Sequence, residues 1–153
     1  MVTTVDYQQI IDDALSVFHN GFACSESVIY SLRKNFGWDG LSDDAIAMST
    51  GFPWGLGGVG CLCGAVAGGA MCLGYVFGRR TPGDPCAARC QQLTCEYAQK
   101  VQQELGATCC GTLIAEFADR NAPERKAKCS KAVAYCAKTA SEIIVRECGL
   151  QAK

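Results

Sequence analysis

Apolar residues recur with a helical period over most of the chain. Residues three and four positions apart lie on the same face of a helix. Between residues 7 and 20, the apolar residues have this spacing: Ile10, Ile11, Ala14, Leu15 and Phe18. The same pattern predicts long helices over residues 25–36, 62–79, 86–105 and 124–148, and short ones over 42–48 and 112–119. No segment alternates with the period of a strand, so the sequence predicts an all-α fold.

Glycine and proline separate the predicted helices. A glycine-rich loop spans residues 50–60, and the clearest interruption of the chain is Thr81-Pro-Gly-Asp-Pro85. A chain of 153 residues is long enough to bury one hydrophobic core, so we expect residues 1–153 to form a single cysteine-rich helical domain. Its architecture is expected to resemble a four-helix bundle with short accessory helices.

Composition and charge then narrow the classes of function. The chain is 49% hydrophobic and 19% charged, with a formal net charge of −1. Its basic residues are scattered, so its charge gives no reason to expect nucleic-acid binding. The N-terminus has neither the basic nor the apolar region of a signal peptide. The most apolar stretch, residues 61–77, is glycine-rich and short for a membrane span. We therefore expect a cytoplasmic protein with no membrane span.

The cysteine content gives the most specific indication of function. The chain has 12 cysteines and one histidine, a balance that favours thiolate, metal–sulfur or thiol redox chemistry over histidine-based catalysis. A disulfide-stapled scaffold is disfavoured because such scaffolds are normally much smaller. The cysteines are Cys24, Cys61, Cys63, Cys72, Cys86, Cys90, Cys95, Cys109, Cys110, Cys129, Cys136 and Cys148.

The predicted helices place some cysteines together. Cys24, Cys63 and Cys110 each lie near a predicted helix start, where unpaired N–H groups and the helix dipole favour a thiolate. Cys86 and Cys90 are four residues apart and share a helix face. Convergence of the three helix starts at one end of a bundle would create a metal–sulfur site. Cys72 and Cys148 are more simply interpreted as structural residues.

The glycine-rich loop is a second candidate. Gly55-Leu-Gly-Gly-Val-Gly60 has the G-x-G-x-x-G spacing of a dinucleotide site but lacks the surrounding βαβ unit. We expect instead that the backbone N–H groups of Gly57, Gly58 and Gly60 approach an anionic group beside the neighbouring cysteines. A tight turn without ligand-binding function is the alternative.

Several ordered segments resemble a known family. They are residues 20–28 around Cys24, the loop leading into Cys63-Gly-Ala65, residues 73–79, residues 106–113 and the late Cys129. Together they resemble the C_GCAxxR_C_C family of redox-active proteins, a domain of which is similar to one in split-Soret cytochromes. The resemblance implies four characteristic cysteines, matching Cys24, Cys63, Cys110 and Cys129. It also implies an arginine where Gly68 stands. No C-x-x-C-H motif for covalent haem is present.

These observations predict a metal–sulfur redox or electron-transfer protein. Its group would be a [4Fe–4S] or [2Fe–2S] cluster, or a larger or second cluster, and the protein would serve a redox partner protein. The primary ligands would be the four family cysteines, with additional ligands from Cys61, Cys86, Cys90 and Cys95. Two alternatives stay open, a Cu(I)-binding or storage bundle and a metal-free thiol–disulfide protein. Homodimer formation and enzymatic activity are also left open.

Overall fold

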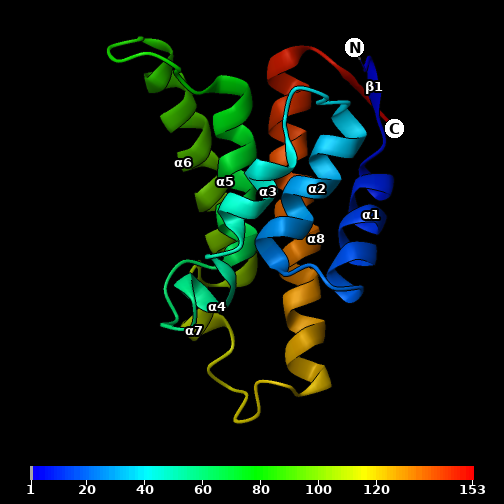
Figure 1. Ribbon diagram of the computed structural model, residues 1–153, viewed down its shortest axis with the longest axis vertical. Helices are drawn as coiled ribbons and strands as arrows, with labels where there is room; N and C mark the ends of the chain where they lie inside the picture. The colour runs from blue at the N-terminus through cyan, green and yellow to red at the C-terminus, as the bar shows by residue number, and fades with distance from the viewer. Residues whose placement is uncertain (1) are drawn as a thin grey trace.

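The computed structural model describes residues 2–153 and is almost entirely helical (Figure 1). Two short strands flank eight helices in chain order. The elements are β1 (Thr4–Val5), α1 (Tyr7–His19), α2 (Cys24–Phe36), α3 (Asp43–Ser49), α4 (Pro53–Leu56), α5 (Gly64–Phe77), α6 (Cys86–Leu105), α7 (Cys110–Leu113), α8 (Pro123–Cys148) and β2 (Gln151–Ala152).

Local sequence explains where the long helices begin and end. The Asp6 carboxylate accepts hydrogen bonds from the first turn of α1, including one of 2.9 Å from the Gln8 N–H. Helices α2, α6 and α8 each end at a glycine in the left-handed conformation, namely Gly37, Gly106 and Gly149. The helix boundaries are thus determined by capping residues that the sequence already contains.

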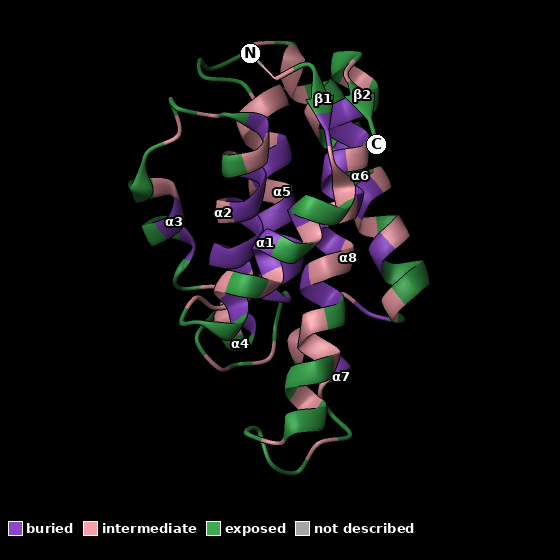
Figure 2. Cartoon of the chain, turned by 90° about the vertical axis from the view of Figure 1, so that its right-hand side faces the viewer, coloured by how far each residue is buried: buried purple, intermediate pink, exposed green. Residues whose placement is uncertain are grey.

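Helix α2 lies at the centre of the bundle. It packs against α1, α5 and α8, while α6 covers α5 and α8 from the other side (Figure 1). The buried residues gather where these helices meet, and the first turns of α8 project beyond them with mostly exposed and half-buried residues (Figure 2). The core therefore lies where the long helices meet, and the first turns of α8 lie outside it.

Glycines in α5 allow its neighbours to approach closely. A Cβ at Gly68 would lie 2.7 Å from the Ser25 carbonyl oxygen of α2 and 3.1 Å from the Val28 Cβ. A Cβ at Gly69 would overlap the Tyr97 hydroxyl of α6, which instead donates hydrogen bonds to the carbonyls at the start of α5. The spacing of α2, α5 and α6 therefore depends on the absence of side chains at these positions.

The all-α fold predicted from the sequence is confirmed, with some differences in detail. The five long helices predicted from the sequence are all present within residues 2–153, so the bundle has one long helix more than a four-helix bundle. The predicted helix over 112–119 is instead the single turn Cys110–Leu113. A parallel pairing of Thr4 with Gln151 and Val5 with Ala152 was not expected, because it joins residues far apart in the sequence. Among residues 2–153, no helix has the length and apolar content of a membrane span.

An ion pair between α6 and α8 gives the fold a testable pH dependence. Two nitrogens of Arg146 donate to Glu96, at 2.7 and 2.9 Å, and Lys100 lies 3.1 Å away. The hydrogen bonds from Arg146 lower the pKa of Glu96 from its usual 4.5 to about 2. Because the folded pKa is depressed, the stabilisation is complete above pH 4.5 and is lost as the pH falls through 2.

We predict that Glu96→Gln lowers the free energy of unfolding at pH 7 by about 1–2 kcal/mol, a value reduced for solvent screening. Urea denaturation of both chains between neutral and acidic pH measures this difference. The two stabilities are expected to converge as the pH approaches the folded pKa of Glu96. A difference that stays constant over this range would contradict the electrostatic explanation.

Candidate functional site

A cavity of about 640 Å³ opens between α8 and the starts of α2, α5 and α7. Figure 1 shows these helix starts in the lower half of the molecule. Four of the residues that line the cavity are the cysteines Cys24, Cys63, Cys110 and Cys129. Cysteines that are up to 105 residues apart in the sequence, Cys24 and Cys129, thus face one space. The predicted convergence of three helix starts is therefore present in the structure.

Close packing of α2 on α5 brings the first two cysteines together. Cys24 is the first residue of α2, and Cys63 immediately precedes α5. The Cys24 sulfur lies so close to Gly64 that a Cβ at Gly64 would overlap it. The glycine that follows Cys63 therefore makes room for the Cys24 side chain beside it.

An antiparallel β-bridge brings the third cysteine to this pair. Leu62 pairs with Cys109, and the bridge is closed by the Cys63 N–H donating to Thr108 at 2.8 Å and the Cys110 N–H donating to Cys61 at 2.7 Å. These bonds fix the start of α7 next to the start of α5. The bridge therefore holds Cys110 at the same cavity as Cys63.

The fourth cysteine comes from α8 and has an arginine partner. An N–H group of Arg125, one turn earlier on α8, lies 3.5 Å from the Cys129 sulfur. The guanidinium carbon of Arg125 also lies 4.7 Å from the centre of the Trp54 ring, and that of Arg120 lies 5.5 Å from it. Sequence reasoning missed Arg125 as a neighbour of Cys129, although its spacing of four residues from Cys129 on a helix could have indicated it.

Burial raises the pKa of the three cavity thiols at helix starts, Cys24, Cys63 and Cys110. Loss of solvent, followed by repulsion from Cys63, raises the pKa of Cys24 to about 12. Burial also raises the pKa of Cys63, even though the N–H groups of Val66 and Ala65 donate to its sulfur and lower it. Burial raises the pKa of Cys110 as well, against the influence of two nearby arginines. These thiols are therefore poor nucleophiles at neutral pH.

The charges around the cavity favour an anionic occupant. Its lining contains two acidic side chains, Glu104 and Glu124, and four basic ones, Arg125, Lys126, Lys128 and Lys131. Several metal-bound thiolates carry a net negative charge that such a lining would stabilise. The basic excess is local, because the whole chain has a net charge of −1.

The thiols do not form the compact ligand set of a single ion. Within residues 2–153, no group of three or more histidine, cysteine, aspartate or glutamate side chains lies close enough together to hold one metal ion. A tetrahedral ion would require its sulfur ligands to be about 3.8 Å apart, given metal–sulfur distances of about 2.3 Å.

The other predicted ligands lie elsewhere. Cys61 is exposed beside the bridge and does not line the cavity. Cys86, Cys90 and Cys95 belong to the first half of α6, whereas Glu104 and Leu105 at its end reach the cavity. The helical rise places even Cys95 about 15 Å along the axis from Leu105. The structure therefore does not bring these four cysteines to the primary set. Cys72 and Cys136 are buried in the core.

The glycine-rich loop forms hydrogen bonds within itself. None of Gly57, Gly58 and Gly60 lines the cavity, and the N–H groups of Gly57 and Gly60 donate to carbonyls of the same loop, at Pro53 and Trp54. These two N–H groups are therefore not free to approach an anion. The expectation that the three glycines contact an anionic group beside the cysteines stays a prediction, which these two hydrogen bonds do not support.

Comparisons with known proteins give one match. A family model described as "Putative redox-active protein (C_GCAxxG_C_C)" matches residues 22–143. Its designation has glycine where the sequence-based expectation had arginine, and Gly68 occupies the matching position three residues after Ala65. That expected arginine was therefore an error. In the family designation, Gly-Cys precedes the alanine, whereas in this chain Cys63-Gly64 precedes Ala65. No curated protein and no solved structure matches the chain.

Proposed function

This chain belongs to the C_GCAxxG_C_C family of redox-active proteins, and we propose that it is an electron-transfer protein carrying an iron–sulfur cluster. The proposed ligands are the cavity cysteines Cys24, Cys63, Cys110 and Cys129. The single observation that carries the proposal is that these four thiols, from four different helices or helix starts, line one cavity. Four cysteine thiolates are the usual ligand set of a [2Fe–2S] or [4Fe–4S] cluster.

The residues around the cavity fit such a group chemically. Metal binding replaces the thiol protons, so the raised pKa values of Cys24 and Cys63 do not prevent it but make it depend on pH. N–H groups from α5 and from Arg125 are placed to donate to sulfur and so reduce its negative charge. When bound, the cluster would supply one-electron chemistry, and the protein would set its potential through these donors.

Specific observations disfavour the two alternatives. A thiol–disulfide protein needs an accessible thiolate, whereas burial raises the pKa of Cys24, Cys63 and Cys110. A Cu(I) storage bundle would direct many cysteines along its interior. Within residues 2–153 the fully buried cysteines are only Cys63, Cys72 and Cys136. Both alternatives remain measurable outcomes of the experiment below.

Anaerobic purification followed by absorption spectroscopy and metal analysis tests the proposal. We expect broad visible absorption that bleaches with dithionite, together with iron and acid-labile sulfide. A colourless protein that carries copper would refute it in favour of metal storage. A metal-free protein with a measurable disulfide couple would refute it in favour of thiol–disulfide exchange.

The hydrogen bond from Arg125 gives a second prediction. Replacing Arg125 by leucine removes a donor and a positive charge next to Cys129, and the oxidised, less negative cluster is then favoured. We expect the reduction potential to fall by about 60 mV, which corresponds to about 1.4 kcal/mol for one electron. Redox titration measures the change, and the control is Arg79→Leu, since Arg79 lies just beyond the C-terminal end of α5 and does not line the cavity. An unchanged potential in Arg125→Leu would contradict the donor role.

A further inference from the structure

The exposed apolar side chains of this protein are concentrated in one short segment. All of the exposed large hydrophobic residues among residues 2–153 lie between positions 48 and 62. Four of them lie in α4 and in the loop that joins it to α5, and we call these four the loop patch: Trp54, Leu56, Val59 and Leu62. Large apolar side chains that are exposed within one short segment make that segment a candidate binding surface.

The backbone around Trp54 and Leu56 is held in an unfavourable conformation. Trp54 and Leu56 have φ angles of 61° and 63°, and Gly55 and Gly57 between and after them have 67° and 69°. These four residues form a left-handed turn, which L-residues with side chains rarely adopt. Hydrogen bonds from Gly60 and Cys61 to Trp54 and Gly55 close the turn. Folding alone would be served better by glycine at position 56, so its leucine indicates a function for the side chain.

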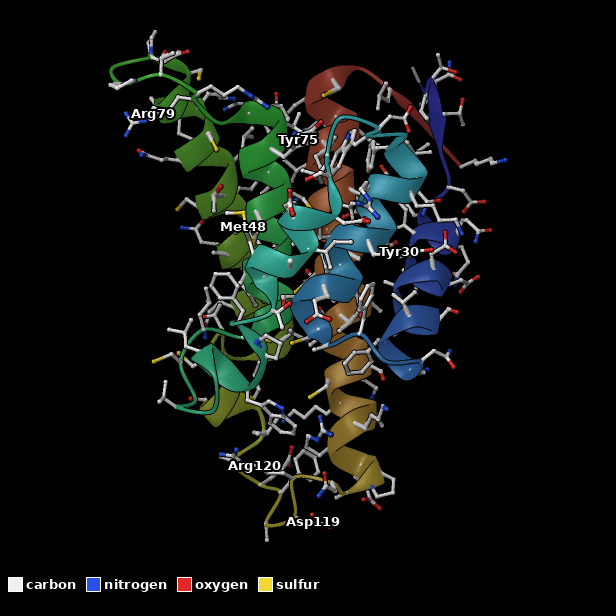
Figure 3. The ribbon with its side chains drawn as sticks, viewed as in Figure 1. Tyr30, Met48, Tyr75, Arg79, Asp119 and Arg120 are labelled. Atoms are coloured by element: carbon white, nitrogen blue, oxygen red, sulfur yellow. The ribbon has the colours of Figure 1, made fainter. Side chains whose placement is uncertain are left out.

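Basic residues flank the loop patch. The side chains of Arg120 and Arg125 lie over the Trp54 ring, and Figure 3 shows Arg120 at the lower end of the molecule, opposite Arg79. Exposed apolar side chains with two arginines at one end are complementary to a partner with exposed apolar residues and acidic neighbours. A symmetric contact between two copies of this chain would bring the same arginines toward each other, which disfavours self-association.

The loop patch adjoins the thiol cavity. Trp54 lines that cavity together with Pro53, the residue before it. A protein bound at the loop patch would therefore lie next to the four cysteines. We propose that the loop patch docks an acidic electron-carrying protein. The carrier's redox role rests on the proposed function, but binding itself requires only the loop patch and its arginines.

Isothermal titration calorimetry of the full chain tests the proposal. Two acidic carriers are titrated, a plant-type [2Fe–2S] ferredoxin and a flavodoxin, each at low and at physiological ionic strength. We expect at least one carrier to bind, and more weakly as salt increases. Leu56→Gly is expected to weaken binding at least about tenfold while leaving the melting temperature unchanged or higher. Arg120→Glu should weaken binding and reduce its salt dependence, and the control Arg79→Glu should do neither.

The proposal is overturned if neither carrier binds, or if Leu56→Gly and Arg120→Glu bind as the parent chain does. Sedimentation that reveals self-association dependent on Leu56 would also overturn it, because the occupant would then be a second copy. Cys63→Ser is titrated in parallel. If that variant lacks iron but still binds the carrier, docking is independent of the cluster. If the parent chain carries no iron yet binds through Leu56, the proposed function fails and the docking surface stands.

Discussion

Cys63→Ser is expected to remove the visible chromophore and to lower the bound iron to less than about a tenth of that in the parent chain. Serine preserves the size of the side chain but offers oxygen, a poor ligand for an iron–sulfur cluster. Cys63 is central to the candidate site, because its neighbours in electrostatic range include Cys24, Cys110 and Cys129. Absorption spectra and iron and sulfide analysis after anaerobic purification measure the effect.

Cys148→Ser is the matched control for this variant. Cys148 is the last residue of α8, is exposed, and does not line the cavity. Its replacement is expected to leave the absorption, iron and sulfide unchanged. Circular dichroism of both variants verifies that the fold is retained. Equal iron in Cys63→Ser and in the parent chain would refute the ligand role of Cys63 and, with it, the proposed ligand set.

Gly68→Ala is expected to destabilise the protein by about 2–3 kcal/mol, which corresponds to a melting temperature about 5–10 °C lower. The added Cβ would lie 2.7 Å from the Ser25 carbonyl oxygen and 3.1 Å from the Val28 Cβ, so α2 must shift away from α5. Because Cys24 precedes Ser25, the shift also displaces a proposed ligand. We therefore expect lower iron content as well as lower stability, measured by urea denaturation and metal analysis.

Gly74→Ala separates this packing effect from the general effect of replacing glycine. Gly74 lies in the same helix, but a Cβ there would meet no atom within 4 Å. Alanine has the higher helix propensity, so this variant is expected to gain about 0.5–1 kcal/mol and to keep its iron. Opposite signs for the two variants support close α2–α5 packing. Stabilisation by both would contradict it.

The long helices could be predicted because the signals that define them are local. The stripe in α1 and the terminal glycines Gly37, Gly106 and Gly149 determine most helix positions to within a few residues. The pairing of β1 with β2 could not be predicted in this way, because it depends on two segments that meet only after the bundle has formed. The left-handed turn at Trp54 could not be predicted either, because two of its residues, Trp54 and Leu56, have side chains that disfavour positive φ angles.

The candidate site was partly predictable for the same reason. Helix starts are local features, and Cys24, Cys63 and Cys110 do lie at the starts of α2, α5 and α7. The positions of Cys86, Cys90 and Cys95 relative to these starts depend on which end of α6 faces the cavity. Helical periodicity gives the face on which a residue lies but not the neighbours that this face meets. The sequence therefore provides no information on whether these additional candidate ligands lie near the four cavity cysteines.

The sequence by itself therefore determined the all-α class, the helix starts that carry three of the cysteines, and the membership of a redox-active family. Only the tertiary structure decided which cysteines share a cavity. Two long-range contacts are responsible, the close approach of α2 at Gly64 and Gly68 and the bridge between Leu62 and Cys109. Such contacts depend on the packing of whole helices against one another, and residue order along the chain does not encode that packing in any local pattern.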